Sequence, residues 1–506
     1  MVRTYARTVT TTPRSLRLLA VGLVVALGAG ACASDDATEP EDAATTTEDA
    51  PAAADAAAQD LEWDDCGPME CTTVEVPLDF EEPDGEQIDI PVARVPAGDP
   101  DKRIGVLIVN PGGPGFPATQ FVASAASFLP REVTERFDIV GYDSRGTGGA
   151  LGVDCTDDLD AVYALDPTPD SAAEEAERND VGAALAVACE EEAGDDLRWV
   201  STERTARDLD VIRDALGEEQ LNLLGYSYGT YLGGAYADLF PERVRAFVLD
   251  GAVDPTLDPV EQFVQQADGG EVALMAFLDD CADDASCPFN DGSDLVERFD
   301  RLMAAIDDDP LPTDDGEVLG PGEAHLGVFG SLFSQGDWSS LAEGLADATD
   351  GDGTGLYQAF AAYVSRIDDG EYADISEGYW AISVADGLLP TTLEEYDEIL
   401  EVEPRLGPAI IAENVMSAYW PVPPEREPRP WGAEGSNPIL VIPSTRDPAT
   451  PYEAGVALAE QLDNGVLLSY DGDGHTAYAN GVDCVDDIVN AYLIGLEVPD
   501  GEGASC

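Results

Sequence analysis

The chain has 506 residues, too many for one simple core, so two lobes or one core with a large insertion are expected. It carries 103 Asp and Glu against 24 Lys and Arg, for a formal net charge of -79, and Lys102 is its single lysine. Such a carboxylate excess repels nucleic acid, which argues against that class of partner, and together with the scarcity of lysine it suggests an acidic, halophilic protein stabilised by concentrated salt.

An export signal opens the chain. Four arginines precede the short apolar run LLAVGLVVALGAGA, which predicts a cleavable signal peptide over residues 1–31. Cys32 follows, and AGAC resembles a bacterial lipobox, in which the cysteine is lipidated; an ordinary secretory signal cleaved nearby is the alternative. Residues 32–60 contain almost no large apolar side chain, so we expect a disordered acidic tether between the membrane and the folded body.

Strand and helix patterns alternate from residue 87, as an α/β sheet requires. Apolar runs at 87–95, 104–110, 137–143, 221–226 and 244–255 predict strands, and apolar residues at helical spacing predict a helix over 206–217. Nearly continuous apolar runs suit a mostly parallel sheet flanked by helices on both faces. Residues 61–255 are therefore expected to form the first part of a core.

The character of the chain changes after residue 255. Residues 256–435 are helical, acidic and interrupted by Asp, Gly and Pro loops, which predicts a large helical cap inserted before the last two strands. Residues 436–506 restore the strand pattern at 437–451 and 465–476, with a helix-like segment at 452–462 between them. This last part is expected to complete the core.

The sequence GYSYG at 225–229 follows an apolar strand and precedes a small-residue helix. This is the G-x-S-x-G pattern that places a serine on a sharp strand-to-helix turn, and its glycines allow the turn because they carry no side chain. Ser227 is therefore the candidate nucleophile of an α/β-hydrolase fold.

A serine nucleophile needs a base, and histidine is the usual one because its pKa lies near the working pH. The chain has two histidines. His475 follows a predicted strand, where a loop can present its ring at the sheet edge, whereas His325 lies in the helical insertion and is expected to be structural. His475 is therefore the candidate base.

The base needs a carboxylate that orients its ring. Asp447 ends the strand before the histidine strand and gives the chain order Ser, Asp, His; Asp250, after the strand that follows Ser227, is the rival. Asp143 is expected to brace a loop. Asp471 and Asp473 lie too close to the histidine in sequence to align its ring.

The oxyanion of an acyl-transfer intermediate needs backbone donors. One candidate is the N–H of Tyr228, directly after the nucleophile. The other is expected from NPGGPG at 110–115, after an early strand, with Gly113 favoured and Gly112 as its neighbour. The loop lacks the patterns of phosphate-binding loops, and a plain tight turn is the other interpretation.

Eight cysteines remain if Cys32 is lipidated, an even number that predicts disulfides in an exported protein. They fall into sequence-local couples, although eight cysteines permit 105 connectivities and sequence does not choose among them. No Cys/His cluster has zinc spacing, and we expect neither a metal nor another cofactor. The couples are Cys66 with Cys71, Cys155 with Cys189, Cys281 with Cys287, and Cys484 with Cys506.

Most of residues 61–506 resembles the secreted tripeptidyl aminopeptidase and proline iminopeptidase-like serine peptidases of actinobacteria. The resemblance rests on VNPGGPG, FDIVGYDSRGTG, LLGYSYGTYLG, FVLDGAVDP, PILVIPSTRDPATP and GDGHTAY in that order. It implies an α/β-hydrolase core with a helical cap, a TAP-like C-terminal module, a triad of Ser227, Asp447 and His475, and an oxyanion hole at Gly113 and Tyr228. It also implies an extracytoplasmic enzyme that releases short peptides or single residues from free N-termini.

Two other functions stay open. A carboxylesterase could use the same triad, and a non-catalytic binding lipoprotein would need only export and tethering. An exopeptidase must bind the substrate's ammonium, normally with carboxylates, but among so many acids the sequence identifies none. Aromatic residues of the cap such as Trp380, Tyr419 and Trp420 could line the substrate pocket or only pack within the cap.

Overall fold

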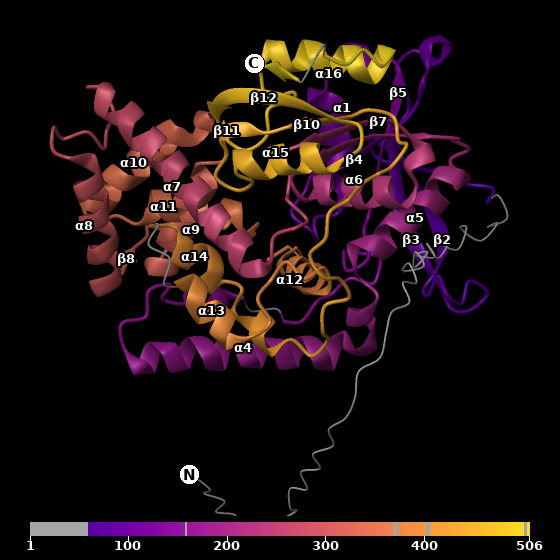
Figure 1. Cartoon of the computed structure of the whole chain (residues 1–506). Helices are drawn as coiled ribbons and strands as arrows, with labels where there is room; N and C mark the ends of the chain where they lie inside the picture. The colour runs from indigo at the N-terminus through magenta and orange to yellow at the C-terminus, as the bar shows by residue number, and fades with distance from the viewer. Residues whose placement is uncertain (1–58, 157–158, 368–371, 374, 401–404, 500–502) are drawn as a thin grey trace, which may run out of the picture. The chain divides into compact units, whose positions relative to one another are not determined.

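The computed structural model describes residues 59–156, 159–367, 372–373, 375–400, 405–499 and 503–506 (Figure 1). The predicted signal peptide, Cys32 and nearly all of the predicted tether lie outside the described residues. Within the described part of the chain, no helix is both long enough and apolar enough to span a membrane.

The core is one mixed sheet with the strand order β1-β2-β3-β5-β4-β6-β7-β10-β12-β11, and β13 pairs with β12. Neighbours from β1 to β5 along this order are antiparallel, and all pairs from β5 onward are parallel. This confirms the predicted, mostly parallel α/β sheet. The strands are β1 (Asp64–Cys66), β2 (Met69–Pro77), β3 (Gln87–Val95), β4 (Gly105–Asn110), β5 (Phe137–Tyr142), β6 (Leu221–Tyr226), β7 (Val244–Asp250), β10 (Ile439–Ile442), β11 (Ser444–Arg446), β12 (Gly465–Asp473) and β13 (Ala504–Ser505).

Helices cover both faces of the sheet, which explains the continuous apolar runs. Every residue of β4, β5 and β6 is buried. Leu107 and Val109 pack with α1 (Ala118–Phe128) and α16 (Asp483–Gly495), whereas Val106 and Ile108 belong to the core on the other face, with α5 (Thr202–Ala215), α6 (Tyr228–Leu239) and α15 (Tyr452–Gln461) (Figure 1). Successive strand residues thus face opposite layers. A short helix, α2 (Arg131–Thr134), precedes β5.

The segment between β7 and β10 is helical, as predicted, apart from a two-stranded hairpin of β8 (Leu311–Pro312) and β9 (Val318–Leu319). Among the described residues its helices are α7 (Pro259–Asp283), α8 (Leu295–Asp308), α9 (Pro321–Ser331), the 3-10 helix η4 (Gln335–Asp337), α10 (Trp338–Thr349), α11 (Thr354–Tyr363), α12 (Ser376–Ala385), α13 (Leu393–Leu400), α14 (Gly407–Ala412) and the 3-10 helix η6 (Val415–Tyr419). We call this segment the cap.

A second helical segment, between β5 and α5, packs against the cap. It contains α3 (Asp160–Tyr163) and the long α4 (Ala172–Glu192), which runs below α13 in Figure 1. Gly182 of α4 lies so close to η6 that a Cβ there would come within 2.8 Å of the Val415 side chain. The cap predicted from the sequence, residues 256–435, does not include this second helical segment. Those domain boundaries stay a prediction.

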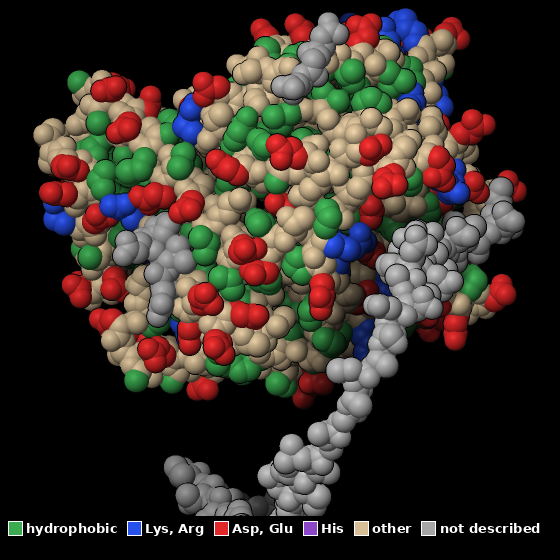
Figure 2. All heavy atoms as spheres, in the orientation of Figure 1, with side chains coloured by type: hydrophobic (Ala, Val, Ile, Leu, Met, Phe, Trp, Pro, Cys, Tyr) green, Lys and Arg blue, Asp and Glu red, His purple; other side chains and the backbone are tan. Residues whose placement is uncertain are grey.

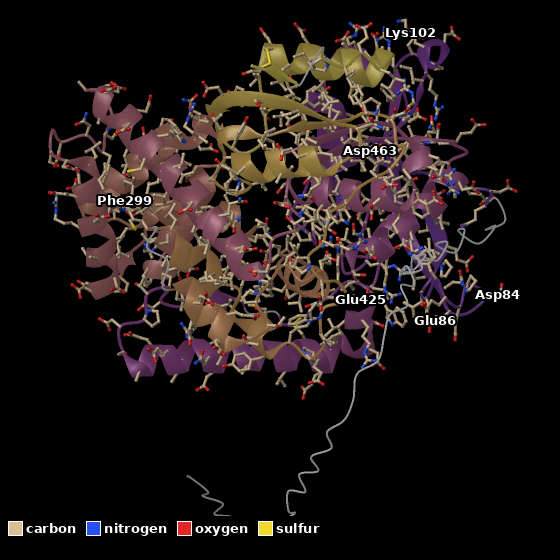
Figure 3. All side chains as sticks on the ribbon, viewed as in Figure 1. Asp84, Glu86, Lys102, Phe299, Glu425 and Asp463 are labelled. Carbon is tan, nitrogen blue, oxygen red and sulfur yellow. A yellow bond between two sulfur atoms is a disulfide. The ribbon has the colours of Figure 1, made fainter. Side chains whose placement is uncertain are left out.

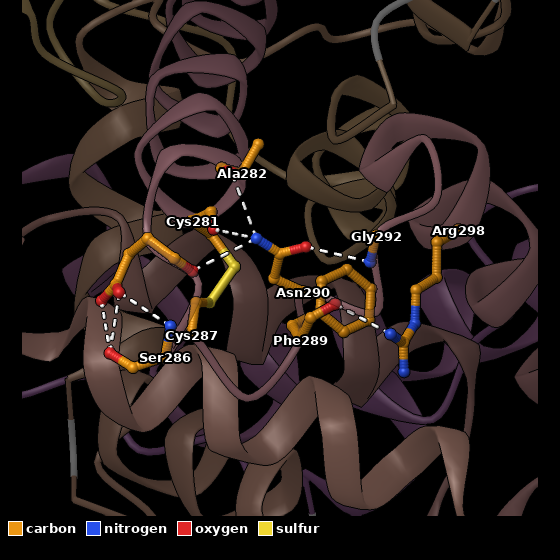
Figure 4. Close-up of a disulfide and its surroundings, with 9 residues drawn as sticks. Cys281, Ala282, Ser286, Cys287, Phe289, Asn290, Gly292 and Arg298 are labelled. Carbon is orange, nitrogen blue, oxygen red and sulfur yellow. Dashed lines mark hydrogen bonds between the residues drawn. A yellow bond between two sulfur atoms is a disulfide. The ribbon is translucent and has the colours of Figure 1, made fainter.

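Four disulfides join the cysteines in the predicted pairs, Cys66 with Cys71, Cys155 with Cys189, Cys281 with Cys287, and Cys484 with Cys506. Figure 4 shows the third pair at the end of α7. There the side chain of Asn290 donates hydrogen bonds to the carbonyl oxygens of Cys281 and Ala282, which holds the turn after the helix.

Acidic side chains are scattered over the face seen in Figure 2, with few basic ones between them. Lys102, which Figure 3 labels at the outer surface of the core, forms ion pairs with Asp99 at 2.7 Å and Glu135 at 3.6 Å. On the face seen in Figure 2, the acidic side chains are therefore spread out rather than gathered at one site.

Candidate active site

Ser227 lies at the turn between β6 and α6, with φ 52° and ψ -123°. Left-handed φ is uncommon for a residue other than glycine and indicates a strained turn. A Cβ at Gly225 would lie 2.2 Å from the carbonyl oxygen of Gly229, and one at Gly229 would lie 2.9 Å from Oδ1 of Asn110. Neither position has room for a side chain, so both must be glycine, as the sequence pattern predicted.

Asp447 and His475 come together at the carboxyl end of the sheet. Nδ1 of His475 lies 2.9 Å from both carboxylate oxygens of Asp447, which is 1% exposed. Oδ1 of Asp447 also accepts hydrogen bonds from the backbone N–H groups of Ala449 at 2.9 Å and Thr450 at 2.8 Å. The turn after β11 thus fixes the carboxylate, and the carboxylate fixes the imidazole ring.

The cap helps to hold the loop of His475. The backbone N–H of His475 donates to the carbonyl oxygen of Phe333 at 2.8 Å, and the two rings meet edge to face, 5.1 Å apart. Burial acts to lower the pKa of His475, but the carboxylates of Asp447 and then Asp250 outweigh burial and raise the pKa above its ordinary value. Since Nδ1 is bonded to Asp447, Nε2 is left for Ser227, which lines the same cavity.

Asp250, the rival acid, contacts the loop rather than the ring. Its carboxylate is fully buried and accepts hydrogen bonds from the backbone N–H groups of Ala477 and Tyr478, the latter at 2.8 Å. Burial raises the pKa of Asp250 to about 7. Asp250 therefore supports the backbone that follows His475, and Asp447 orients its ring.

The remaining acids near the site have structural partners. Asp143 accepts a hydrogen bond from the backbone N–H of Thr119 at 3.0 Å, at the start of α1. Arg446 pairs with Asp471 at 3.1 Å and with Asp473. These contacts agree with the expectation that none of the three orients the base.

The glycine loop after β4 contacts Ser227. The N–H of Gly112 donates to Oδ1 of Asn110 at 3.0 Å, and a Cβ on Gly112 would come within 2.6 Å of Cβ of Ser227. Gly113 has φ 40°, lines the cavity and would meet no atom within 4 Å if it carried a Cβ; among the described residues its N–H has no hydrogen-bond acceptor. The N–H of Tyr228, in the first turn of α6, likewise has no acceptor within its helix. Gly113 and Tyr228 thus offer two donors beside Ser227, and the Gly112 N–H is already used.

His325 lies within α9, away from this constellation. Its Nδ1 is 2.8 Å from the carbonyl oxygen of Pro321, and burial lowers its pKa. It does not line the cavity beside Ser227. These contacts agree with the expected structural role.

The cavity above Ser227 has a volume of about 400 Å³ and is closed mainly by the cap. Most of its lining is aromatic or apolar, so it suits a substrate with apolar side chains. Trp380 contributes to this lining, whereas Tyr419 and Trp420 do not. The apolar and aromatic lining residues from the cap include Phe263, Phe329, Phe333, Tyr363, Val364, Ile375, Tyr379, Trp380, Leu388 and Ile410.

Glu413, directly after α14, is the one acidic side chain among the residues that line this cavity. Burial raises its pKa to about 8, and within the described chain its carboxylate has neither a hydrogen-bond donor nor a cation beside it. Its charge acts on the tyrosines Tyr163, Tyr363 and Tyr379. The sequence offered no signal for Glu413, because one more glutamate in an acidic chain follows no motif.

Two family models match the chain. The model described as alpha/beta hydrolase fold matches residues 105–274, and the model described as TAP-like protein matches residues 403–506. The first match contains Ser227 and the glycine loop, and the second contains Asp447 and His475. Both halves of the constellation therefore lie in matched regions.

Curated relatives match over most of the chain. Serine protease Hip1 of Mycobacterium tuberculosis is 36% identical over 88% of this chain and 91% of its own. Carboxylesterase B of the same species is 35% identical over 85% of each chain, and tripeptidyl aminopeptidase of Streptomyces lividans is 32% identical over 88% of this chain and 86% of its own. The chain therefore belongs to the α/β-hydrolase family with a TAP-like C-terminal module, a family of serine hydrolases that includes tripeptidyl aminopeptidase and the serine protease Hip1.

Proposed function

We propose that this serine hydrolase is an exported exopeptidase that releases short peptides or single residues from free peptide N-termini. Ser227 is the nucleophile, His475 the general base and Asp447 the carboxylate that orients it. The relatives named tripeptidyl aminopeptidase and serine protease support a peptide substrate. The observation that carries the proposal is the half-buried carboxylate of Glu413, unpaired within the described chain and the one acidic side chain among the residues that line the cavity above Ser227.

The proposed chemistry follows from the constellation. Oγ of Ser227 attacks the acyl carbon while its proton passes to Nε2 of His475, and Asp447 stabilises the imidazolium. The oxyanion accepts hydrogen bonds from the N–H groups of Gly113 and Tyr228. His475 then protonates the leaving amine, and water, activated by the same base, hydrolyses the acyl-enzyme.

Glu413 distinguishes a peptide N-terminus from a neutral acyl group. A carboxylate in an apolar cavity is costly when ionised and unpaired, as its raised pKa reflects. An incoming α-ammonium offsets this cost by forming a charge-assisted hydrogen bond, and the faces of the surrounding tyrosine rings favour a cation. A substrate with a blocked N-terminus gains neither interaction.

The test compares a tripeptidyl amide reporter, Ala-Ala-Pro-aminomethylcoumarin, with its N-acetylated form. We expect the free form to be preferred, and Glu413→Gln to remove roughly 10- to 100-fold of that preference, mainly through KM, because one charged hydrogen bond is lost. Hydrolysis of a short acyl ester should change little. Equal turnover of both peptides by the unaltered enzyme, or an unchanged preference in the variant, would overturn the proposal.

Glu323→Gln is the matched control. Burial raises the pKa of Glu323 to about 7, as burial raises that of Glu413, but Glu323 lines a different hollow and accepts a hydrogen bond from the N–H of Gly320. The same substitution there removes a buried carboxyl group without touching the cavity above Ser227. We expect it to leave the preference for a free N-terminus unchanged.

A carboxylesterase is the second candidate, because the relative named Carboxylesterase B is about as similar as the peptidases. The same triad and oxyanion donors hydrolyse esters, and the cap decides the substrate. Turnover of short acyl esters with no turnover of either peptide amide would favour this function. A non-catalytic lipoprotein, the third alternative, would not label at Ser227 with a fluorophosphonate, whereas we expect labelling that Ser227→Ala abolishes.

An extracytoplasmic location is supported by the four disulfides. Attachment to the membrane through a lipid on Cys32 is part of the proposal. Incorporation of a labelled fatty acid in cells, lost in Cys32→Ala, is the expected result, and unlabelled protein in the culture medium would indicate free secretion. The expectation that nucleic acid is not a partner stays a prediction.

A further inference from the structure

A chain of buried hydrogen bonds connects the nucleophile elbow with the cap. The hydroxyl of Tyr228 is hydrogen-bonded to Oγ1 of Thr202, the first residue of α5. Oγ1 of Thr202 donates to Oδ2 of Asp386 at 2.5 Å, and its backbone N–H donates to Oδ1 at 2.8 Å. Thr202 is 0% exposed and Asp386 is 2% exposed, so water does not compete for these bonds.

The direction of the bonds follows from their donors. Burial raises the pKa of Asp386 to about 7. In its ionised form Asp386 only accepts, so both the N–H and the hydroxyl of Thr202 donate to it, and the hydroxyl of Tyr228 donates to Thr202. The carboxylate lies at the N-terminus of α5, where the helix dipole favours negative charge. Figure 3 labels Glu425 in the same region, where it accepts a hydrogen bond from Oγ of Ser201 at 2.6 Å.

Asp386 lies directly behind the wall of the substrate cavity and itself lines a separate hollow with Ser201 and Glu425. It directly follows α12, whose residues Tyr379, Trp380 and Ser383 line that cavity. At the other end, the ring of Tyr228 stacks on Tyr231 with centroids 6.3 Å apart. The chain thus joins the helix that faces the substrate to the residue whose backbone N–H faces the oxyanion.

Fixing both ends of the Tyr228 side chain also fixes its backbone. The ring is attached to the same Cα as the N–H, and only two torsions separate them. Oxyanion donors act by being held in place before the reaction, and a small displacement lowers the rate strongly. Losing the hydroxyl's partner removes one of the contacts that hold Tyr228.

We propose that Thr202 and Asp386 are positioning residues that hold the oxyanion donor Tyr228 in place and tie it to α12 of the cap. This inference rests on the proposed roles of Ser227 as nucleophile and Tyr228 as oxyanion donor. It adds two residues, from a core helix and from the cap, that touch no substrate and act through Tyr228.

The first test uses Thr202→Val, which keeps the shape of the side chain and removes its hydroxyl. We expect the rate of fluorophosphonate labelling and kcat for a short acyl ester to fall roughly tenfold, with KM little changed. Thr202→Ser, which keeps the hydroxyl, should restore most of the rate. These readouts do not depend on peptide specificity.

Thr205→Val is the matched control. Thr205 lies on the same helix, is 1% exposed, and within the described chain its hydroxyl has no hydrogen-bond partner. We expect its labelling rate to stay within about twofold of the unaltered enzyme. An equal fall in both variants, in step with their thermal stability, would show a purely structural effect and overturn the proposal.

A double-mutant cycle with Tyr228→Phe gives the second test, because that change removes the same hydrogen bond from the other side. The double variant should be labelled no more slowly than the slower of the two single variants, whereas the two reductions in labelling rate would multiply if they were independent. Multiplying effects, or a Thr202→Val enzyme that labels at the normal rate, would overturn the positioning role alone. An unaltered enzyme that does not label at Ser227 would overturn the proposed nucleophile and this inference with it.

Discussion

Replacing Asp447 with Asn tests the assignment of the orienting carboxylate, which the sequence left open between two acids. In Asp447, Oδ1 accepts both backbone hydrogen bonds, from Ala449 and Thr450. An amide oxygen has to take that place, because its NH₂ group cannot accept from an N–H. The NH₂ group then lies where Oδ2 was, 2.9 Å from Nδ1 of His475. The amide oxygen at the Oδ1 position is equally near Nδ1, but it already accepts two backbone N–H groups.

The expected magnitude follows from the tautomer. An NH₂ donor beside Nδ1 makes Nδ1 the acceptor, so the proton moves to Nε2, which can no longer take the proton of Ser227. Loss of the orienting carboxylate in such a triad costs about 10⁴-fold in kcat, which corresponds to about 5.4 kcal/mol of transition-state stabilisation. The backbone hydrogen bonds survive, so the melting temperature should change by only a few degrees.

Asp250→Asn is the matched comparison. It changes the same chemical group at the end of β7, where the carboxylate accepts from the N–H groups of Ala477 and Tyr478 rather than from the ring. We expect kcat for a short acyl ester to fall by less than about 100-fold there, because the loop shifts but the tautomer does not change. The reverse ranking of Asp447→Asn and Asp250→Asn would refute the reasoning and identify Asp250 as the orienting acid.

Three further predictions concern the base and the glycine loop. Burial acts to lower the pKa of His475, but the neighbouring carboxylate of Asp447 raises it above its ordinary value of 6.5. We therefore expect the acid limb of the pH–rate profile to have its midpoint above pH 6.5. A midpoint below that value would contradict the pairing of His475 with Asp447. The raised pKa of His475 also stabilises the folded state at pH values below the pKa of this histidine in the unfolded chain. This contribution is lost as the pH rises through its pKa in the folded protein. His475→Ala should abolish turnover, whereas His325→Ala should lower the melting temperature and leave kcat nearly unchanged; swapped outcomes would refute the choice of base. Gly112→Ala should nearly stop fluorophosphonate labelling, because its Cβ would lie 2.6 Å from Cβ of Ser227, whereas Gly113→Ala, with no atom within 4 Å, should slow it less; the opposite order would refute the loop geometry.

Local signals in the sequence predicted much of the core. The run at 87–95 is β3 with the same bounds, and the elbow strand is β6, because continuous apolar runs between turn residues describe buried strands well. The four disulfides join cysteines 5 to 34 residues apart, and sequence-local pairing was sufficient for them. The predicted strand over 437–451 is two short strands, β10 and β11, separated at Pro443, which has no N–H to donate to a sheet.

Long-range proximity could not be predicted. Asp250 and Asp447 both end strands of the sheet near the histidine loop, and chain order does not show which acid meets the ring and which meets the backbone. Thr202 and Asp386 are 184 residues apart and belong to no motif. The helical segment around α4 joins the cap through packing against η6 and through contacts such as those of Tyr163 with Ser376 and Arg178 with Asp397. These features depend on how separate segments meet, which periodicity and composition do not encode.

Because the chain is so acidic, the sequence does not single out Glu413. Added salt distinguishes the effect of Glu413 in the cavity from the effect of the surface carboxylates. At about 1 M salt, charges more than about 3 Å apart in solvent are screened, so repulsion among the surface carboxylates falls and the melting temperature should rise with salt. A carboxylate inside the cavity is screened much less. The preference for a free over an acetylated N-terminus should therefore persist in molar salt. A preference that disappears as salt is added would show that the surface field, and not Glu413, selects the ammonium, and a melting temperature independent of salt would refute the adaptation to salt.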